Sequence, residues 1–152
     1  MEIKAPNRYK QAKRPFIFLA GSIEMGKADN WQAAVAKEFD DCTVLNPRRE
    51  DWDSSWVQDI RNPQFRRQVE WELDAQTDAD LILMHFEPNT QSPITLLELG
   101  LFAQKRGLIV HCPDGFWRKG NVDIVCKNYN VLEVSNFESM LIEARQYLRG
   151  IY

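Results

Sequence analysis

A single carboxylate stands in an otherwise apolar stretch of the sequence, the residues SPITLLELG that run from Ser92 to Gly100. The Ser-Pro pair at its start is typical of the first residues of a helix, with Ser92 as the N-cap. Three later apolar residues fall at helical spacing and are predicted to face the core: Leu97, Leu101 and Phe102. An acid on such a helix is costly to bury unless it has partners or a catalytic role, so Glu98 is the first candidate for chemistry.

Two other acids, Glu72 and Asp80, lie on the segment that precedes this helix and could act together with Glu98. A carboxylate can attack an anomeric carbon through an oxocarbenium-like transition state while a second acid assists the leaving group. The residue types alone leave an alternative open, in which Glu98 is a helix-face acid that backbone amides or an arginine satisfy.

Other kinds of catalysis lack their residues. His85 and His111 both fall within apolar runs, where a packed, neutral histidine is expected, and no base is near Cys112. The histidines and cysteines do not have the spacing of metal ligands. We therefore expect neither a metal ion nor another cofactor.

The elements that must position these acids alternate between strands and helices. Apolar runs predict strands at residues 16–20, 42–45, 81–86, 108–112 and 131–134. Helical spacing predicts helices at residues 29–39, capped by Asp29, at 65–78, at 93–106, ended by Gly107, and at 137–149, with a short helix opening near residue 122. This order predicts an α/β fold, a three-layer sandwich with a mainly parallel five-stranded sheet.

The unusual loops all follow predicted strands: Gly21-Ser22, residues 46–56, residues 89–92 and residues 116–121. Ligands of open parallel sheets bind at the carboxyl ends of strands, so these loops are predicted to meet at one edge. Gly21 and Ser22 are therefore candidate ligand contacts. In the long second loop, Arg48, Arg49 and the tryptophans either line a pocket or form a solvated surface with the loop's own acids.

Length and charge bound the protein further. The chain has 152 residues and a net charge of −3, with 44% hydrophobic and 27% charged residues. This composition predicts a basic N-terminal arm at residues 1–14 and one folded domain at residues 15–152. The charge offers no general attraction to long nucleic acid or to an anionic membrane, and neither is expected as a partner. Three cysteines without metal spacing indicate reduced thiols and a cytoplasmic protein, and no signal peptide or membrane-spanning run is evident.

Several motifs together resemble the nucleoside 2-deoxyribosyltransferase-like family: FIFLAGSI, NPRREDWD, the AD pair that opens a strand, LLELG and GFWRKGNV. The resemblance spans residues 16–122, and it implies a flavodoxin-like fold and cleavage or transfer at the N-glycosidic bond of nucleosides or nucleoside monophosphates. It implies that the ELG glutamate, Glu98, is the nucleophile and that Glu72 or Asp80 helps the base to leave. The motifs also supply the expected substrate contacts: Gly21, Ser22, Ile23, Asn46, Arg48, Arg49, Trp52, Ser92 and Asn121.

Two of these positions carry further implications from the resemblance. Ser92 stands where the transferases have an aspartate that reads the base and where the phosphate hydrolases have a serine near the 5′-phosphate, so it favours the hydrolase pattern. Asn121 matches an asparagine that a neighbouring subunit contributes to the sugar site, which implies a homodimer or a higher homo-oligomer. The expected partner is otherwise a small nucleoside or nucleotide substrate.

The sequence also departs from the family pattern. Phe18 replaces a tyrosine of the first strand that helps to orient the nucleophile, and Glu24 replaces an arginine that supports the phosphate. Residues 94–96 replace a glycine-rich segment. Alternative hypotheses are a module that binds a nucleotide or an ADP-ribose-like ligand without turnover, an N-glycosidase that cleaves NAD, and a structural or partner-binding α/β domain.

Overall fold

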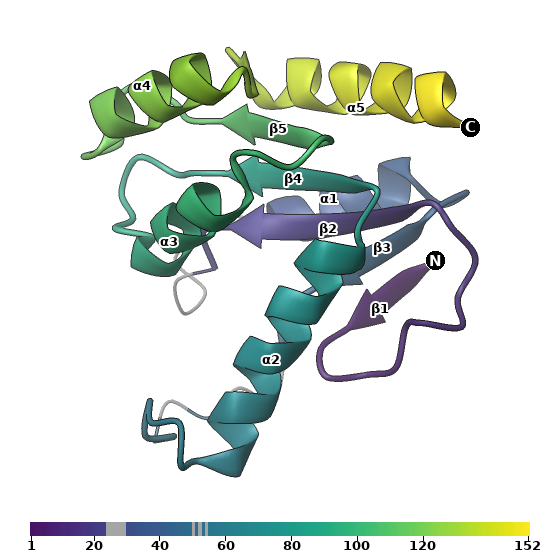
Figure 1. The fold of residues 1–152 in the computed structure, drawn as a ribbon, viewed down its shortest axis with the longest axis vertical. Coiled ribbons are helices and arrows are strands. Elements are labelled where there is room, and N and C mark those ends of the chain that lie inside the picture. The colour runs from purple at the N-terminus through teal and green to yellow at the C-terminus, as the bar shows by residue number, and fades with distance from the viewer. Residues whose placement is uncertain (24–29, 50, 52, 54) are drawn as a thin grey trace.

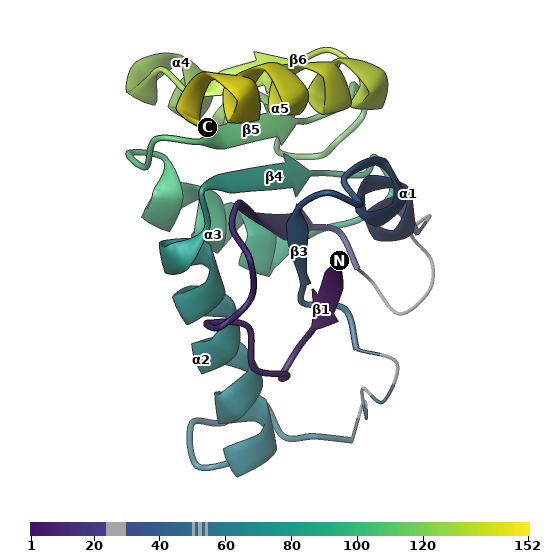
Figure 2. The same cartoon turned by 90° about the vertical axis from the view of Figure 1, so that its right-hand side faces the viewer.

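We describe the fold from a computed structural model, which covers residues 1–23, 30–49, 51, 53 and 55–152. A parallel sheet lies between two layers of helices (Figure 1, Figure 2). The strands are β1 (Glu2–Lys4), β2 (Phe16–Gly21), β3 (Thr43–Asn46), β4 (Leu81–His85), β5 (Leu108–His111) and β6 (Leu132–Val134). Their order in the sheet is β1-β3-β2-β4-β5-β6. The predicted three-layer α/β sandwich is confirmed, and from β3 to β6 the order is that of flavodoxin-like folds.

The sheet has six strands where the sequence predicts five, because the N-terminal segment adds one. β1 pairs in parallel with β3, with Ile3 opposite Leu45. Farther along the same segment, Ala5 and Tyr9 are buried in the core, and the Tyr9 hydroxyl donates to Asp78 Oδ2 at 2.9 Å. The basic residues that suggest a solvated arm therefore alternate with apolar ones that dock it onto the domain.

Within the described residues, five helices cover the two faces of the sheet. They are α1 (Trp31–Glu38), α2 (Pro63–Asp78), α3 (Pro93–Phe102), α4 (Lys119–Tyr129) and α5 (Phe137–Ile151). Side chains of α1 and α5 form one core with alternate strand residues such as Ile17 and Leu83. Side chains of α2, α3 and α4 form the other core with the intervening residues such as Phe18 and Met84. The alternation of side chains along each strand thus decides which helices each strand residue contacts.

The helix ends differ slightly from the sequence-based bounds. Asn30 caps α1 by accepting a bond from the Ala33 amide, and the predicted cap Asp29 lies outside the described residues. The helix that carries Glu98 ends at Phe102 rather than near residue 106. Gly107 therefore does not end that helix. It lies in the turn before β5 with a φ of 79°, where an added Cβ would stand 2.3 Å from the Asp80 carbonyl oxygen.

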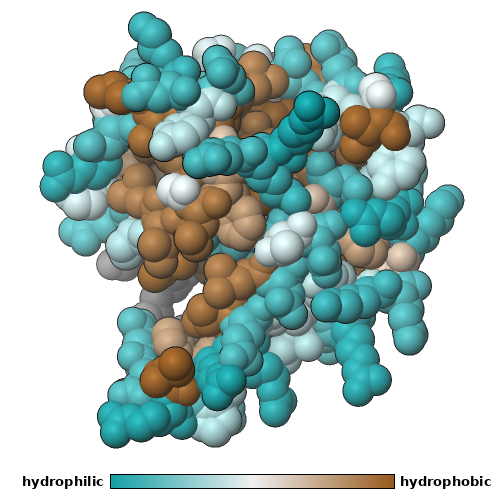
Figure 3. Space-filling view, viewed as in Figure 1, coloured by the Kyte–Doolittle hydropathy of each residue, from teal (hydrophilic) through white to brown (hydrophobic). Residues whose placement is uncertain are grey.

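The prediction for the faces of α3 is wrong for two leucines. Leu97 and Leu101 are 59% and 57% exposed, whereas the buried side chains of the helix are Thr95, Glu98 and Leu99. Because α3 is apolar almost all round, helical spacing could not distinguish the face against the sheet from the opposite face. Figure 3 shows the resulting apolar patch over the part of the surface where α3 lies in Figure 1. Among the described residues, no helix has the length and apolar character needed to cross a membrane.

Candidate active site

The centre of the site is the boundary between β2 and β4. From β2 the chain passes to β3 on one side, and it then returns across β2 to form β4 on the other side. Gly21 ends β2 there with a φ of 149°, and an added Cβ would stand 2.2 Å from the His85 carbonyl oxygen. The Ser22 amide donates to that same oxygen at 3.0 Å. The two strands therefore meet at the type of sheet edge where α/β proteins bind ligands, and the contact requires glycine.

Three hydroxyl groups cluster at this edge. Ser22 Oγ lies 2.7 Å from Ser92 Oγ and 2.8 Å from Thr90 Oγ1, and the latter two atoms are 2.8 Å apart. All three side chains are buried, and the Glu87 amide donates to Ser22 Oγ at 3.1 Å. Ser22 and Ser92, which the sequence predicts as substrate contacts, are thus brought together.

The expected role of Ser92 as a helix cap is only half correct. Ser92 occupies the N-cap position of α3, but its φ is 44° and its side chain makes no capping hydrogen bond. The hydroxyl group turns instead to Ser22 and Thr90. Left-handed backbone is costly for serine, and such strain is found where function constrains the chain. The left-handed backbone of Ser92 therefore accompanies the turn of its hydroxyl group into the cluster.

Glu98 lies on the second turn of α3 and is only 8% exposed. Its Oε1 accepts a hydrogen bond of 2.8 Å from Gln76 Nε2 of α2. Burial, with a smaller contribution from the negative charge of Glu72, raises the pKa of Glu98 to about 8, although the Gln76 bond opposes the shift. Burial also raises the pKa of Glu72, whose Oε1 accepts from Gln68 Nε2 at 2.7 Å. The structure thus brings together the two acids Glu98 and Glu72, and at pH 7 the pair retains a proton.

The raised pKa of Glu98 predicts how stability depends on pH. Between pH 4.5, the ordinary pKa of a glutamate, and about pH 8, Glu98 keeps its proton in the folded protein but has lost it in the unfolded chain. The free energy of unfolding should therefore fall as the pH rises through this interval, on the order of 1.4 kcal/mol per pH unit. Glu98→Gln removes this dependence, so its stability relative to wild type should grow from pH 5 to pH 8 in urea-unfolding experiments.

The control for this measurement is Glu143→Gln, on the partly exposed face of α5. Its pH dependence should remain parallel to that of the wild type. Equal slopes for Glu98→Gln and the wild type would contradict the buried, protonated state of Glu98.

Asp80 does not join the two glutamates. It lies at the amino end of β4, where its carboxylate accepts 2.7 Å bonds from Arg14 Nη2 and from the Phe16 amide. Phe16 is the first residue of β2, so this ion pair fixes the starts of β2 and β4, whereas the hydroxyl cluster follows their ends. The sequence could not show which of the two acids lies near Glu98, because Glu72 and Asp80 are close in sequence. Helix α2 ends between them, so they lie in different parts of the structure. Of the two predicted assisting acids, the geometry supports Glu72.

The two arginines of the loop after β3 have different surroundings. Arg49 forms an ion pair with Asp51, with Nη2 to Oδ2 at 2.7 Å, and its guanidinium group lies 5.0 Å from the Trp56 ring centroid. Arg48 instead extends its Nη1 to Gln32 Oε1 of α1, at 3.5 Å. Arg49 therefore pairs with an acid of its own loop, although its side chain is only 10% exposed. Among the described residues, the contact with Gln32 is the one side-chain hydrogen bond of Arg48.

The remaining predicted contacts are placed less directly. Asn46 is buried and internally bonded, because its side chain accepts from the Arg48 amide at 2.9 Å and donates to Glu2 at 2.7 Å. Ile23 is partly exposed beside Ser22, and Asn121 is exposed on the first turn of α4. Trp52 and Glu24 lie outside the described residues.

The loop before α4 also reaches this edge. Trp117 Nε1 donates to the Gln91 carbonyl oxygen at 2.9 Å, next to the hydroxyl cluster. Three of the predicted loops therefore meet through direct hydrogen bonds, which agrees with the predicted convergence.

The two histidines pack against each other behind the cluster. His85 Nδ1 lies 2.9 Å from His111 Nδ1, and the rings are stacked with centroids 4.9 Å apart. Burial lowers the pKa of both histidines, that of His85 to about 4. Both are neutral at pH 7, as the sequence predicts, and their rings face the α1 and α5 side of the sheet, away from Glu98.

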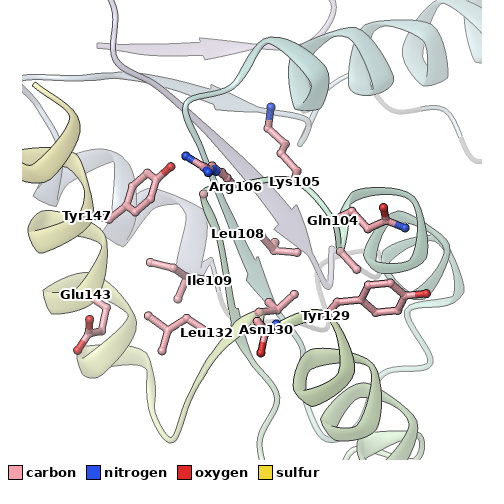
Figure 4. A pocket seen from close by; sticks show the side chains of 13 residues that line it. Gln104, Lys105, Arg106, Leu108, Ile109, Tyr129, Asn130, Leu132, Glu143 and Tyr147 are labelled. Carbon is pink, nitrogen blue, oxygen red and sulfur yellow. The ribbon is translucent and has the colours of Figure 1, made fainter.

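Sequence reasoning missed three polar residues of the site: Gln68, Gln76 and Thr90. The two glutamines flank Glu72 at a spacing of four residues, which places all three on one face of α2. This face also lies next to Trp71 and Ala75, which are both buried. Polar residues at that spacing beside apolar ones were the sequence signal that could have identified the two glutamines. A pocket of about 390 Å³ lies elsewhere, at the amino ends of β5 and β6, between Tyr129 and Tyr147 (Figure 4), and none of the predicted site residues lines it.

Comparison with known proteins bears directly on this site. No curated protein sequence matches the chain. A model of the family described as nucleoside 2-deoxyribosyltransferase like matches residues 14–116. The matched region contains β2 to β5, the hydroxyl cluster, and both Glu72 and Glu98. The chain therefore belongs to the nucleoside 2-deoxyribosyltransferase-like family.

Proposed function

We propose that this protein is an enzyme that cleaves the N-glycosidic bond of a (deoxy)nucleoside or its 5′-monophosphate, with Glu98 as the nucleophile. The observation that carries the proposal is the pair formed by the buried Glu98 and the half-buried Glu72, on helices of a chain from this family. A pair of acids that holds one proton supplies both a nucleophile and an acid.

The reaction proceeds in two steps. In the first, Glu98 transfers its proton to Glu72, and its carboxylate attacks C1′ as the bond from C1′ to the base nitrogen breaks. The protonated Glu72 gives its proton to the departing base, and the sugar remains as an ester of Glu98. In the second, Glu72 accepts a proton from the incoming group. Attack by water completes hydrolysis, whereas attack by the nitrogen of a second base completes transfer.

The hydroxyl cluster favours a substrate with a 5′-phosphate. Ser22, Thr90 and Ser92 hold three hydroxyl groups at the sheet edge, and hydroxyl groups that exchange their bonds to one another can donate to phosphate oxygens. Arg48 adds a cationic fork, whose contact with Gln32 is long at 3.5 Å. These groups support a nucleoside monophosphate over the free nucleoside.

The test is a panel of nucleosides and 5′-monophosphates, in ribo and deoxyribo forms and with each base, incubated with and without a second free base. Chromatography should show release of the free base, faster from monophosphates, and a new nucleoside if the enzyme transfers. NAD belongs in the panel, because release of nicotinamide would identify the NAD-cleaving alternative. Thermal stabilisation by a nucleotide with no released base would instead support a binding module and contradict the proposal.

We further propose that the active form is a homo-oligomer. The exposed side chains Ile94, Leu97 and Leu101 form one stripe on α3 at helical spacing, and each is at least 57% exposed. Single exposed leucines are common, but a continuous apolar stripe is typical of a surface that another chain covers. Asn121, exposed on α4 beyond the loop that meets Gln91, supports a second copy as that chain.

Leu101→Lys should therefore convert the oligomer into monomers without unfolding the chain, because a charged side chain cannot be buried unpaired in an apolar interface. Size-exclusion chromatography with light scattering measures the mass, and circular dichroism measures the fold. Ile142→Lys, at an exposed apolar position of α5, is the matched control. A monomeric wild type, or equal masses for the wild type and Leu101→Lys, would contradict this interface.

A further inference from the structure

A line of polar side chains runs along α2 toward Glu98, with two buried glutamines on either side of a half-buried glutamate. Gln68, Glu72 and Gln76 follow one another at intervals of four residues. Gln68 Nε2 donates to Glu72 Oε1 at 2.7 Å and to the Pro47 carbonyl oxygen at 3.0 Å. Gln76 Nε2 donates to Glu98 Oε1 at 2.8 Å and to the Glu72 carbonyl oxygen at 3.2 Å. Each glutamine thus holds one of the two glutamates.

Gln76 is the glutamine that contacts Glu98 directly. Its side chain is 0% exposed, and its Oε1 has no hydrogen-bond partner among the described residues. A leucine or methionine of similar size would occupy this position without burying an unpaired polar atom. Packing therefore does not explain a glutamine here, whereas its bond to Glu98 does.

The strand beneath Glu98 offers no competing donor. Phe18 of β2 is fully buried, and its ring has no hydroxyl group at the position where the family resemblance expects a tyrosine. Among the described residues, Gln76 makes the one side-chain hydrogen bond to the Glu98 carboxylate. The task of orienting the nucleophile thus falls to an amide from α2.

We propose that Gln76 is the positioning residue for Glu98, an inference that rests on the proposed function. A carboxamide carries both a donor and an acceptor. Nε2 donates to the ionised Glu98, and after rotation of the amide Oε1 accepts from the protonated carboxyl group. The same side chain thereby holds Glu98 in one place in both protonation states.

The decisive variant is Gln76→Leu, which keeps the volume and removes both hydrogen-bonding atoms. The first measurement needs no substrate: NMR of the labelled Glu98 carboxyl carbon across a pH titration. The Gln76 bond stabilises the ionised form, so its loss should move the titration midpoint of Glu98 to higher pH. Gln68→Leu, on the same face of α2 but bonded to Glu72, is the matched control and should leave this midpoint nearer that of the wild type.

The second measurement uses turnover of a substrate found in the panel. Gln76→Leu should lower kcat by about 10- to 100-fold with KM changed by less than about 3-fold, because a misplaced nucleophile affects the chemical step. The acidic limb of the pH profile of kcat/KM should shift upward with the NMR midpoint. Adding Phe18→Tyr to Gln76→Leu should restore part of kcat, since a hydroxyl group from β2 would replace the lost donor.

The outcomes separate the two proposals. An unchanged Glu98 midpoint in Gln76→Leu overturns the role of Gln76 whatever the enzyme does. Should Gln76→Leu fail to fold, Gln76→Met tests the same bond with an unbranched side chain. A wild type inactive on every substrate, with the Glu98 midpoint raised in Gln76→Leu, overturns the proposed function and retains the link between Gln76 and Glu98.

Discussion

Glu98→Gln is expected to lower the rate of N-glycosidic cleavage by at least about 10³-fold while the fold is retained. The amide has nearly the size of the carboxyl group, so it can keep the contact with Gln76 across the helix pair. It cannot form an ester with C1′, so no glycosyl-enzyme intermediate accumulates. Initial rates of base release under saturating substrate measure this loss.

The same variant also tests the covalent step. Rapid acid quenching of the wild type during turnover, followed by peptide mass spectrometry, should find the peptide containing Glu98 heavier by one glycosyl group, and Glu98→Gln should lack this species. Glu70→Gln, an exposed acid of α2 paired with Arg66, is the control and should keep wild-type rates. Retention of more than about a tenth of the activity by Glu98→Gln would assign the nucleophile elsewhere.

Gly21→Ala is expected to have the largest effect on stability, a loss of about 3 kcal/mol or more. Its Cβ would lie 2.2 Å from the His85 carbonyl oxygen, and its φ of 149° is unfavourable for any residue with a side chain. Neither the added Cβ nor the His85 carbonyl oxygen can move away easily, because the Ser22 amide donates to that oxygen and β2 pairs with β4 along its length. The expected fall in Tm is about 6–12 °C, measured by calorimetry.

Gly120→Ala is the matched control for that measurement. Gly120 lies in the first turn of α4, and no heavy atom would approach its added Cβ within 4 Å. Alanine there should keep or slightly raise Tm, since it favours helix over the unfolded chain. A Gly21→Ala protein as stable as Gly120→Ala would show that β2 and β4 do not approach so closely at the site.

The strands and the fold class follow directly from the residues. Runs such as Phe16–Ala20 and Leu81–Met84 are apolar throughout, which is typical of strands buried on both faces of a sheet, and the structure buries every one of these side chains. Repeated alternation with helices then leaves few arrangements other than a parallel α/β sandwich. β1 escaped this reasoning because a three-residue edge strand next to lysines carries almost no pattern.

Glu98, the proposed nucleophile, likewise stood out as a candidate from local sequence, but its partners did not. Glu98 stands out as one acid in an apolar helix, a feature that needs no knowledge of the fold. Glu72 and Asp80 are separated from Glu98 by many residues of the chain. Their distances from Glu98 therefore depend on how α2 and β4 pack. In the structure the charge of Glu72 acts on Glu98, whereas Asp80 pairs with Arg14 at the amino end of β4.

The stretch from Ser92 to Gly100 shows the same division. Its residue types were enough to predict a helix, an acid of interest and a serine at its start, because propensity and spacing act within a few residues. The exposed face of α3, the turn of Ser92 into a hydroxyl cluster and the bond from Gln76 required the folded chain. Each of these depends on side chains at least 20 residues away in sequence or on a surface that the packing leaves uncovered, and no local pattern encodes such contacts.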